Sequence, residues 1–242
     1  MPWRLIFAKG DIIMKICGLQ KLTLLDYPDK TACTVFTDSC NFRCPFCHNA
    51  SLVFGRVDEK VSEAEFFDFL SMRRGVLSGV AITGGEPTLH SDLGDFIREI
   101  HEMGFSVKLD TNGYLPGVLE KILDTGNVDF VAMDVKSSPD CYAAAVGMDD
   151  VKIENIEKSI DIIKNSGIDF EFRTTAVKGL HSPKDFLEIG RWIGNVPRYF
   201  IQKFVDSGDL IGKGYSSFSD GEMMTLLAMA RVGSPCAALR GV

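Results

Sequence analysis

Short apolar runs alternate with amphipathic segments along most of the chain. The runs are rich in valine, isoleucine and phenylalanine, which is typical of buried strands. We predict strands at residues 31–37, 79–83, 105–109, 128–133, 168–174 and 199–204. Because continuous apolar strands that alternate with helices form parallel sheets, the pattern predicts an α/β fold in which helices cover the sheet.

Helix signals occupy the segments between these runs. Ser62 with Glu65, and Ser219 with Glu222, have the spacing of a capping box at a helix start. Helices are predicted at residues 62–72, 91–103 (capped by Ser91), 118–123 and 152–165, after Ser182 and Pro183, and after Ser219. Periodicity leaves the topology open between a doubly wound open sheet and a curved partial barrel.

Polar residues of unusual types follow five consecutive predicted strands. They lie in segments 40–47, 83–87, 110–113 and 134–136, with Arg173 late in the fifth strand. Sites in parallel α/β folds are built at the carboxyl ends of strands, which meet at one edge of the sheet. The sequence therefore predicts one site assembled from these five segments.

Length and charge exclude several classes of protein. The chain has 242 residues and a mass of 26.7 kDa, and we assign residues 1–14 to an N-terminal extension and residues 15–242 to one domain. The net charge of −7 repels phosphate backbones, so we expect no nucleic-acid partner. No apolar run approaches the roughly 20 residues that a membrane-spanning helix needs, so we expect no membrane partner.

The N-terminus and the cysteine count indicate the compartment. The first residues lack the continuous apolar core of a signal peptide, which predicts a cytoplasmic protein. Met14 is a second plausible start, which makes residues 1–13 a candidate dispensable segment. Seven cysteines, an odd number, argue against a disulfide framework in such a protein.

Three of the cysteines, Cys40, Cys44 and Cys47, lie within eight residues. Thiolates this close repel one another unless a metal or a cluster neutralises them, so the spacing indicates a metal site. The remaining cysteines, at positions 17, 33, 141 and 236, lack partner spacing and are predicted to be small packed side chains.

Several metal sites compete for this spacing. Structural zinc needs four ligands, and His48 directly after Cys47 is an awkward fourth. Residues 44–48 match a c-type haem attachment pattern, which requires export, and a thioredoxin-like dithiol at 44–47 leaves Cys40 unexplained. An iron–sulfur cluster suits clustered thiolates, and three ligands to four irons leave one iron open to a substrate or cofactor.

The motifs together resemble a known family. CNFRCPFC at 40–47 resembles the cluster motif of radical S-adenosylmethionine (SAM) enzymes, and GGEP at 84–87 resembles their second signature. With CHN at 47–49, LDTNG at 109–113 and MDVK at 133–136, the chain is similar to glycyl-radical-enzyme activating proteins. The likeness is closest to activating proteins of anaerobic ribonucleoside-triphosphate reductase, includes GLQKLTLLDYPDK at 18–30, and runs from Lys15 to the end.

The resemblance implies a partial (β/α)6 barrel of the radical SAM type with one 4Fe–4S cluster and SAM. Cys40, Cys44 and Cys47 would be the catalytic ligands of three irons. One electron from the cluster would cleave SAM to a 5′-deoxyadenosyl radical, which removes hydrogen from a glycine of a partner glycyl radical enzyme. Because no second cysteine set is present for another cluster, a flavodoxin or ferredoxin-type reductant would supply the electron.

The same resemblance implies which residues bind SAM. Gly84 and Gly85 would let the backbone approach its methionine part, and Glu86 would accept from its ammonium group. Phe46 would lie against the adenine. Asn112, in the LDTNG motif, belongs to the same cofactor-binding set.

The later strand ends complete this set. Lys136 would pair with the SAM carboxylate, Asp134 would orient Lys136, and Arg173 would contact SAM. A monovalent cation beside SAM would take Asp110, Thr111, Asp134 and the Ala132 carbonyl as ligands, since two converging carboxylates repel unless a cation or Lys136 intervenes.

Two alternatives to the activase remain. One is a radical SAM enzyme that acts on a small molecule, such as a deazaguanine-type synthase. The other is a non-catalytic iron–sulfur electron carrier, which would not need the GGEP and MDVK segments of a SAM pocket. The LDTNG and CHN motifs favour the activase over the small-molecule enzyme.

Overall fold

The centre of the molecule is an eight-stranded sheet whose strands follow the order β1 to β8. The computed structural model describes residues 14–58, 60–206, 208 and 210–242, so the predicted segment 1–13 lies outside the described residues. The strands are β1 (Ile16–Thr23), β2 (Ala32–Thr37), β3 (Gly79–Gly84), β4 (Ser106–Thr111), β5 (Phe130–Asp134), β6 (Asp169–Ala176), β7 (Tyr199–Lys203) and β8 (Ala237–Arg240).

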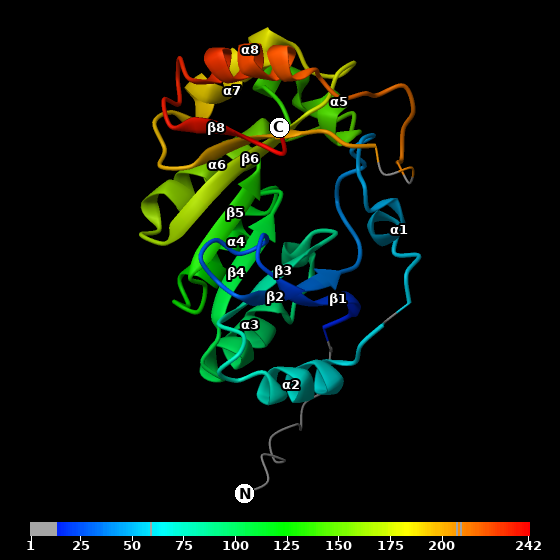
Figure 1. Cartoon of the computed structure of the whole chain (residues 1–242), viewed down its shortest axis with the longest axis vertical. Coiled ribbons are helices and arrows are strands. Elements are labelled where there is room, and N and C mark those ends of the chain that lie inside the picture. The colour runs from blue at the N-terminus through cyan, green and yellow to red at the C-terminus, as the bar shows by residue number, and fades with distance from the viewer. Residues whose placement is uncertain (1–13, 59, 207, 209) are drawn as a thin grey trace, which may run out of the picture.

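The strand order decides the topology that periodicity left open. Strands β2 to β8 pair in parallel with their sequence neighbours, and β1 pairs antiparallel with β2. A doubly wound sheet reverses its order at a switch point, whereas this order is sequential throughout. Within the described residues β1 and β8 do not pair with each other, so the curved sheet in Figure 1 is an open, partial barrel. The predicted α/β fold class is confirmed.

Helices connect the parallel strands and cover the outside of the sheet (Figure 1). They are α1 (Ala50–Val53), α2 (Glu63–Met72), α3 (Leu93–Glu102), α4 (Pro116–Leu123), α5 (Tyr142–Val146), α6 (Ile153–Asn165), α7 (Pro183–Ile193) and α8 (Asp220–Ala230). In Figure 1, α2 and α3 lie below β1 to β3, α4 and α6 lie beside β4 to β6, and α7 and α8 lie above β7 and β8. Apolar side chains between these helices and the sheet form the core, for example Phe66, Phe96 and Phe186.

The helix starts agree with the capping signals at all but one predicted position. Capping boxes form at Ser62 with Glu65 and at Ser219 with Glu222, as predicted. The predicted cap at Ser91 is wrong, because α3 begins at Leu93 after Asp92. The N–H of Leu93 donates to His90 O at 3.2 Å, so a backbone turn supplies a bond at this helix start.

Strands β1 and β8 were not predicted, because neither has the apolar run of a buried strand. Strand β1 is a partly exposed edge whose middle residues face solvent, so it carries no continuous apolar run. Strand β8 has only 4 residues, which is too short for a periodic pattern. Met14, the first described residue, is 1% exposed and packs in the core beside the start of β1. Within the described part of the chain, no helix is long and apolar enough to span a bilayer.

Candidate active site

A cavity of about 190 Å³ lies where β2 to β6 end. Of the residues predicted for the cluster, for SAM and for the cation, all but Ala132, which is fully buried in β5, line it. They are Cys40, Cys44, Phe46, Cys47, Gly84, Gly85, Glu86, Asp110, Thr111, Asn112, Asp134, Lys136 and Arg173. Because parallel strands end at one edge of the sheet, five segments far apart in sequence meet in one place, as the strand pattern predicted.

The cysteine loop follows β2 and is held in place by its backbone. The N–H of Arg43 donates to Val146 O at 2.8 Å, and the N–H of Gly212 donates to Pro45 O at 2.7 Å. Within the loop, the N–H of Cys47 donates to Cys44 O at 3.0 Å. These bonds anchor the loop to two other segments, so the positions of its sulfur atoms do not depend on a metal alone.

The three loop cysteines are free thiols, one buried and two partly exposed. Burial raises the pKa of Cys40 to about 11 and that of Cys44 to about 12, with the nearby Lys136 charge opposing both shifts. A metal ligand must be a thiolate, so loading this site releases protons.

The donor set fits an iron–sulfur cluster better than a single ion. In the residues that the structure describes, no three His, Cys, Asp or Glu side chains converge closely enough to hold one metal ion. A cluster spreads its thiolates over several irons, so three sulfurs can line one cavity without meeting at a point. Soft thiolate donors also suit iron–sulfur clusters.

Gly84 and Gly85 line the cavity and also have a structural role that the sequence did not predict. Gly84 has φ +120°, and a Cβ there would lie 2.3 Å from Thr37 N. A Cβ on Gly85 would lie 1.7 Å from Ser39 O. The close approach that excludes a side chain is therefore between the end of β3 and the chain after β2, where Gly85 N–H donates to Thr37 O at 3.0 Å.

Glu86 is 1% exposed and joins the ends of β3 and β4. Its Oε1 accepts from Thr111 Oγ1 at 2.8 Å and also from Thr88, and its Oε2 accepts from the N–H of Asn112 at 2.7 Å. Burial raises the pKa of Glu86, and these hydrogen bonds oppose the shift. Oε2 accepts one of the two bonds it can form, so it retains capacity for a ligand donor in the cavity.

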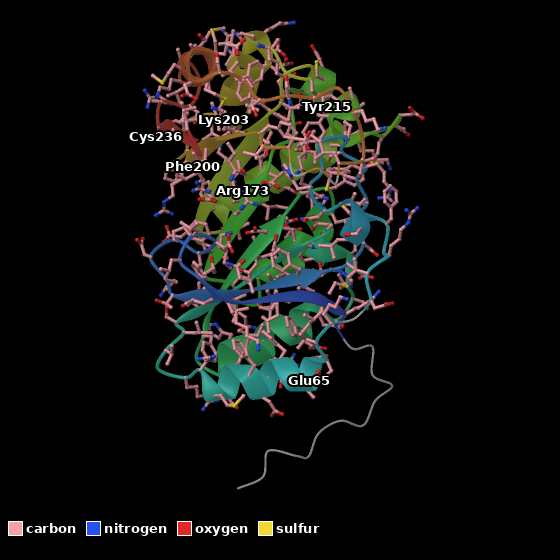
Figure 2. The ribbon with its side chains drawn as sticks, turned by 45° about the vertical axis from the view of Figure 1, so that its right-hand side comes forward. Glu65, Arg173, Phe200, Lys203, Tyr215 and Cys236 are labelled. Carbon is pink, nitrogen blue, oxygen red and sulfur yellow. The ribbon has the colours of Figure 1, made fainter. Side chains whose placement is uncertain are left out.

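A chain of alternating charges crosses the inside of the sheet. Lys108 pairs with Asp110, and Arg173 donates from Nη1 to Asp110 Oδ2 at 3.2 Å and from Nε to Asp134 Oδ1 at 2.8 Å. Lys136 Nζ lies 2.9 Å from Asp134 Oδ2. Figure 2 shows Arg173 near the centre of the molecule, far from the α2 residue Glu65.

This arrangement changes the argument for a bound cation. The prediction rested on two carboxylates that repel each other, Asp110 and Asp134, and the guanidinium of Arg173 already bridges them. Burial alone raises the pKa of Asp134, but the charges of Arg173 and Lys136 outweigh it and hold that pKa far below its usual range. The positive charges of Arg173 and Lys136 therefore already balance the carboxylates whose repulsion was the reason to expect an added cation.

Lys136 stays charged in its partly buried position. Burial alone lowers the pKa of Lys136, but Asp134, followed by the neighbouring cysteines, raises it above its usual value. The cavity therefore offers a cation that Asp134 orients, next to the cysteine loop. That is the arrangement a carboxylate ligand would need.

Sequence reasoning missed the residues that support this wall of the cavity. His181 accepts from the N–H of Val177 at Nδ1 (3.0 Å), and its Nε2 lies 2.9 Å from Lys136 O. Nδ1 must accept and Nε2 must donate, so the ring is neutral. Its ring also lies 6.4 Å from the Phe46 ring, centroid to centroid.

A second set of supports lies deeper on β6 and β8. Glu171 is two residues before Arg173, so both side chains point into the barrel. The two carboxylate oxygens of Glu171 accept hydrogen bonds from Nη1 and Nη2 of Arg240, at 3.0 and 2.9 Å. Arg240 stacks on Phe200, 3.8 Å from the ring centroid. The period of two along β6 could have identified Glu171, whereas nothing in the sequence pairs it with Arg240.

The comparison with protein families uses this same region. A model of the radical SAM superfamily matches residues 34–193, which contain all thirteen cavity residues predicted from the sequence. The chain belongs to the radical SAM superfamily. This family implies a 4Fe–4S cluster and SAM, and the three thiols and the charged cavity fit them. In this radical SAM enzyme the candidate cavity lies at the strand ends and the helices lie outside the sheet.

The chain is also similar to individual proteins of known sequence or structure. The radical SAM chain is 35% identical over 195 residues to "Putative glycyl-radical enzyme activating enzyme MJ1227" of Methanocaldococcus jannaschii, which covers 78% of this chain and 79% of that protein. It is also 29% identical over 176 residues to "GTP 3',8-cyclase" of Aliarcobacter butzleri. That match covers 70% of this chain but 53% of the cyclase. Among solved structures, SuiB of Streptococcus suis bound to precursor peptide SuiA matches with a TM-score of 0.65 at 16% identity, over 84% of this chain and 47% of SuiB, which supports the fold alone.

Proposed function

We propose that this radical SAM enzyme activates a glycyl radical enzyme. The observation that carries the proposal is the similarity to the Methanocaldococcus jannaschii protein, which spans most of both chains. Within the superfamily, the LDTNG and MDVK segments that motivated the activase prediction contribute five of the cavity residues. The proposed partner is an anaerobic ribonucleoside-triphosphate reductase, with a flavodoxin or ferredoxin as reductant.

The proposal assigns each part of the cavity a task. Cys40, Cys44 and Cys47 hold three irons of the cluster. Lys136, oriented by Asp134, binds the carboxylate of SAM, and Phe46 supplies an apolar surface for the adenine. Bound together, the cluster and SAM supply a 5′-deoxyadenosyl radical that takes hydrogen from a glycine.

Two further residues act from the neighbouring strand ends. Glu86 keeps one lone pair for the SAM ammonium and holds the β4 turn with its other bonds. Arg173 keeps Asp134 in place and contacts SAM from β6. A monovalent cation beside SAM is still part of the proposal. Asp110 and Asp134 need it less than the sequence suggested, because Arg173 already pairs with both carboxylates.

A small-molecule radical SAM reaction is the second candidate. The similarity to GTP 3',8-cyclase over 70% of this chain favours it, but this chain spans about half of that protein. A non-catalytic electron carrier is the weaker alternative, because a carrier has no use for a partly buried Lys136–Asp134 pair beside its cysteines.

The test separates these candidates in one assay. The reconstituted protein is reduced anaerobically with SAM and a candidate anaerobic ribonucleotide reductase, and EPR is used to detect a glycyl radical doublet. We expect the doublet together with 5′-deoxyadenosine. Cys44→Ala should abolish both, whereas Cys236→Ala, at an exposed cysteine (Figure 2), should retain both. Release of 5′-deoxyadenosine with GTP but never with a reductase would contradict the activase, and intact SAM throughout would favour the carrier.

A further inference from the structure

Two carboxamide side chains meet beside Cys40. Asn112 lies in the turn after β4, and its Nδ2 is 2.7 Å from Asn41 Oδ1 and 3.8 Å from Cys40 Sγ. The backbone N–H of Phe42 donates to the same sulfur at 3.4 Å. Cys40 thus has one donor from its own loop and another from a different strand end.

The orientation of the Asn112 amide follows from its neighbours. The N–H of Tyr114 donates to Asn112 Oδ1 at 3.0 Å. A flipped amide would turn its NH₂ group toward that N–H and its oxygen toward Asn41 Oδ1, so both contacts would become repulsive. The backbone of Asn112 is also fixed, since its N–H donates to Glu86 Oε2 at 2.7 Å. The NH₂ group is therefore held toward Cys40.

Among the described residues, one buried donor next to Cys40 lacks an acceptor, and Cys40 Sγ itself lies 3.8 Å from the acceptor Asn41 Oδ1. Asn112 is 5% exposed. Asn41 Oδ1 accepts from Asn112, and Asn41 Nδ2 is buried without a hydrogen-bond partner in the described part of the chain. A buried donor without an acceptor costs free energy. A thiolate sulfur, or a sulfide of a cluster bound to it, is an acceptor of the kind this region lacks.

We propose that Asn112 is a positioning residue for the cluster, which donates from its side-chain amide to the Cys40 thiolate and raises the reduction potential of the cluster. The inference rests on the proposed cluster but not on the identity of the protein substrate. It gives Asn112 a task different from the contact with SAM that the sequence suggested.

The direction of the effect follows from charge. Reduction adds one negative charge to the cluster and its thiolates, and a hydrogen bond to a thiolate stabilises the more negative state. Removing the donor should therefore make the cluster harder to reduce. A side chain that only supported the fold would change cluster content or stability without this directed shift in potential.

The test measures the reduction midpoint of the reconstituted cluster, without SAM, by anaerobic titration with dithionite and redox mediators. Visible absorbance reports the oxidised cluster, and iron and sulfide analyses report its content. Asn112→Leu removes the donor, and Asn112→Asp removes it while retaining the oxygen that accepts from Tyr114. We expect both variants to have a lower midpoint potential than the wild type. The potential of Asn112→Asp should be lower than that of Asn112→Leu, because a carboxylate adds negative charge.

Asn155→Leu is the matched control. Asn155 Nδ2 donates to Tyr114 O at 3.1 Å, so it holds the same turn from α6 without contacting a cysteine. We expect the wild-type midpoint in this variant. A wild-type midpoint in Asn112→Leu, which removes the donor without adding charge, or an equal fall in Asn155→Leu, would overturn the proposal. If the wild-type protein takes up no iron and sulfide, the cluster assignment fails and the inference about Asn112 fails with it. If the midpoint shifts as expected but no glycyl radical forms, the inference about Asn112 holds and the activase proposal fails.

Discussion

Arg173 holds Asp134 through a hydrogen bond of 2.8 Å from Nε to Oδ1, inside the barrel and next to the cysteine loop. The same guanidinium reaches Asp110 with Nη1, so one cation serves carboxylates from two neighbouring strands. Both carboxylates stay ionised because the guanidinium and the lysines beside them outweigh the cost of burial. Arg173 therefore links the two carboxylates across neighbouring strands, and Lys108 and Lys136 add to their stabilisation.

Replacing Arg173 should destabilise the whole domain. In Arg173→Leu, Asp110 and Asp134 lose their shared partner but keep Lys108 and Lys136, so we expect a loss below the about 3–5 kcal/mol of a fully buried pair broken on one side. Chemical unfolding followed by circular dichroism measures the loss. Arg198→Leu is the control, because Arg198 pairs with the exposed Asp169 at 3.4 Å and such surface pairs contribute about 0–1 kcal/mol. Equal losses in the two variants would show that the bridge contributes little.

Lys136→Ala should affect ligand binding more than cluster content. Losing one charge-assisted bond to a SAM carboxylate costs about 1.5–3 kcal/mol, which weakens affinity by roughly tenfold to more than a hundredfold. Equilibrium dialysis with SAM and iron analysis measure the two quantities. Lys203→Ala, which loses a pair with Asp220 on the surface side of β7, should leave both unchanged (Figure 2). A parallel fall in iron and affinity would instead indicate a folding role for Lys136.

Gly85→Ala should destabilise the protein although it adds only one methyl group. The new Cβ would lie 1.7 Å from Ser39 O, so β3 and the chain leading to the cysteine loop must separate. Overpacking of this kind costs about 1–3 kcal/mol, and we expect reduced iron uptake as the loop moves. In the control Gly94→Ala no atom lies within 4 Å of the added Cβ on α3, and a gain of about 0.5–1 kcal/mol is expected. Thermal unfolding should show a lower melting temperature than the wild type for Gly85→Ala and a higher one for Gly94→Ala.

His181 should make stability depend on pH below neutrality. Burial lowers the pKa of His181 below its ordinary value of 6.5, so the unfolded chain takes up a proton more readily than the folded one. This contribution to stability is fully present above pH 6.5 and declines as the pH falls through and below that value. The free energy of unfolding measured from pH 7.5 to 5 should fall more steeply in the wild type than in His181→Gln. Identical slopes would contradict a neutral, buried His181.

Local chemistry along the chain was enough to predict most of the cavity lining. Apolar runs predicted six of the parallel strands, and the polar residues directly after five of them became the cavity lining. This works because parallel strands bring their carboxyl ends to one edge whatever the intervening helices do. The spacing of Cys40, Cys44 and Cys47 is equally local, since their loop is only eight residues long.

Pairings between distant segments could be known only from the folded molecule. The choice between a doubly wound sheet and an open barrel depends on strand order, and strands β1 and β8 owe their place to pairing at an edge rather than to an apolar run. Arg173 bridging two carboxylates, Glu86 joining two strand ends and Asn112 facing Cys40 all join residues separated by at least 25 positions. Such contacts leave no trace in periodicity or spacing, because each is set by the relative placement of whole strands, and that placement is determined by packing in the core.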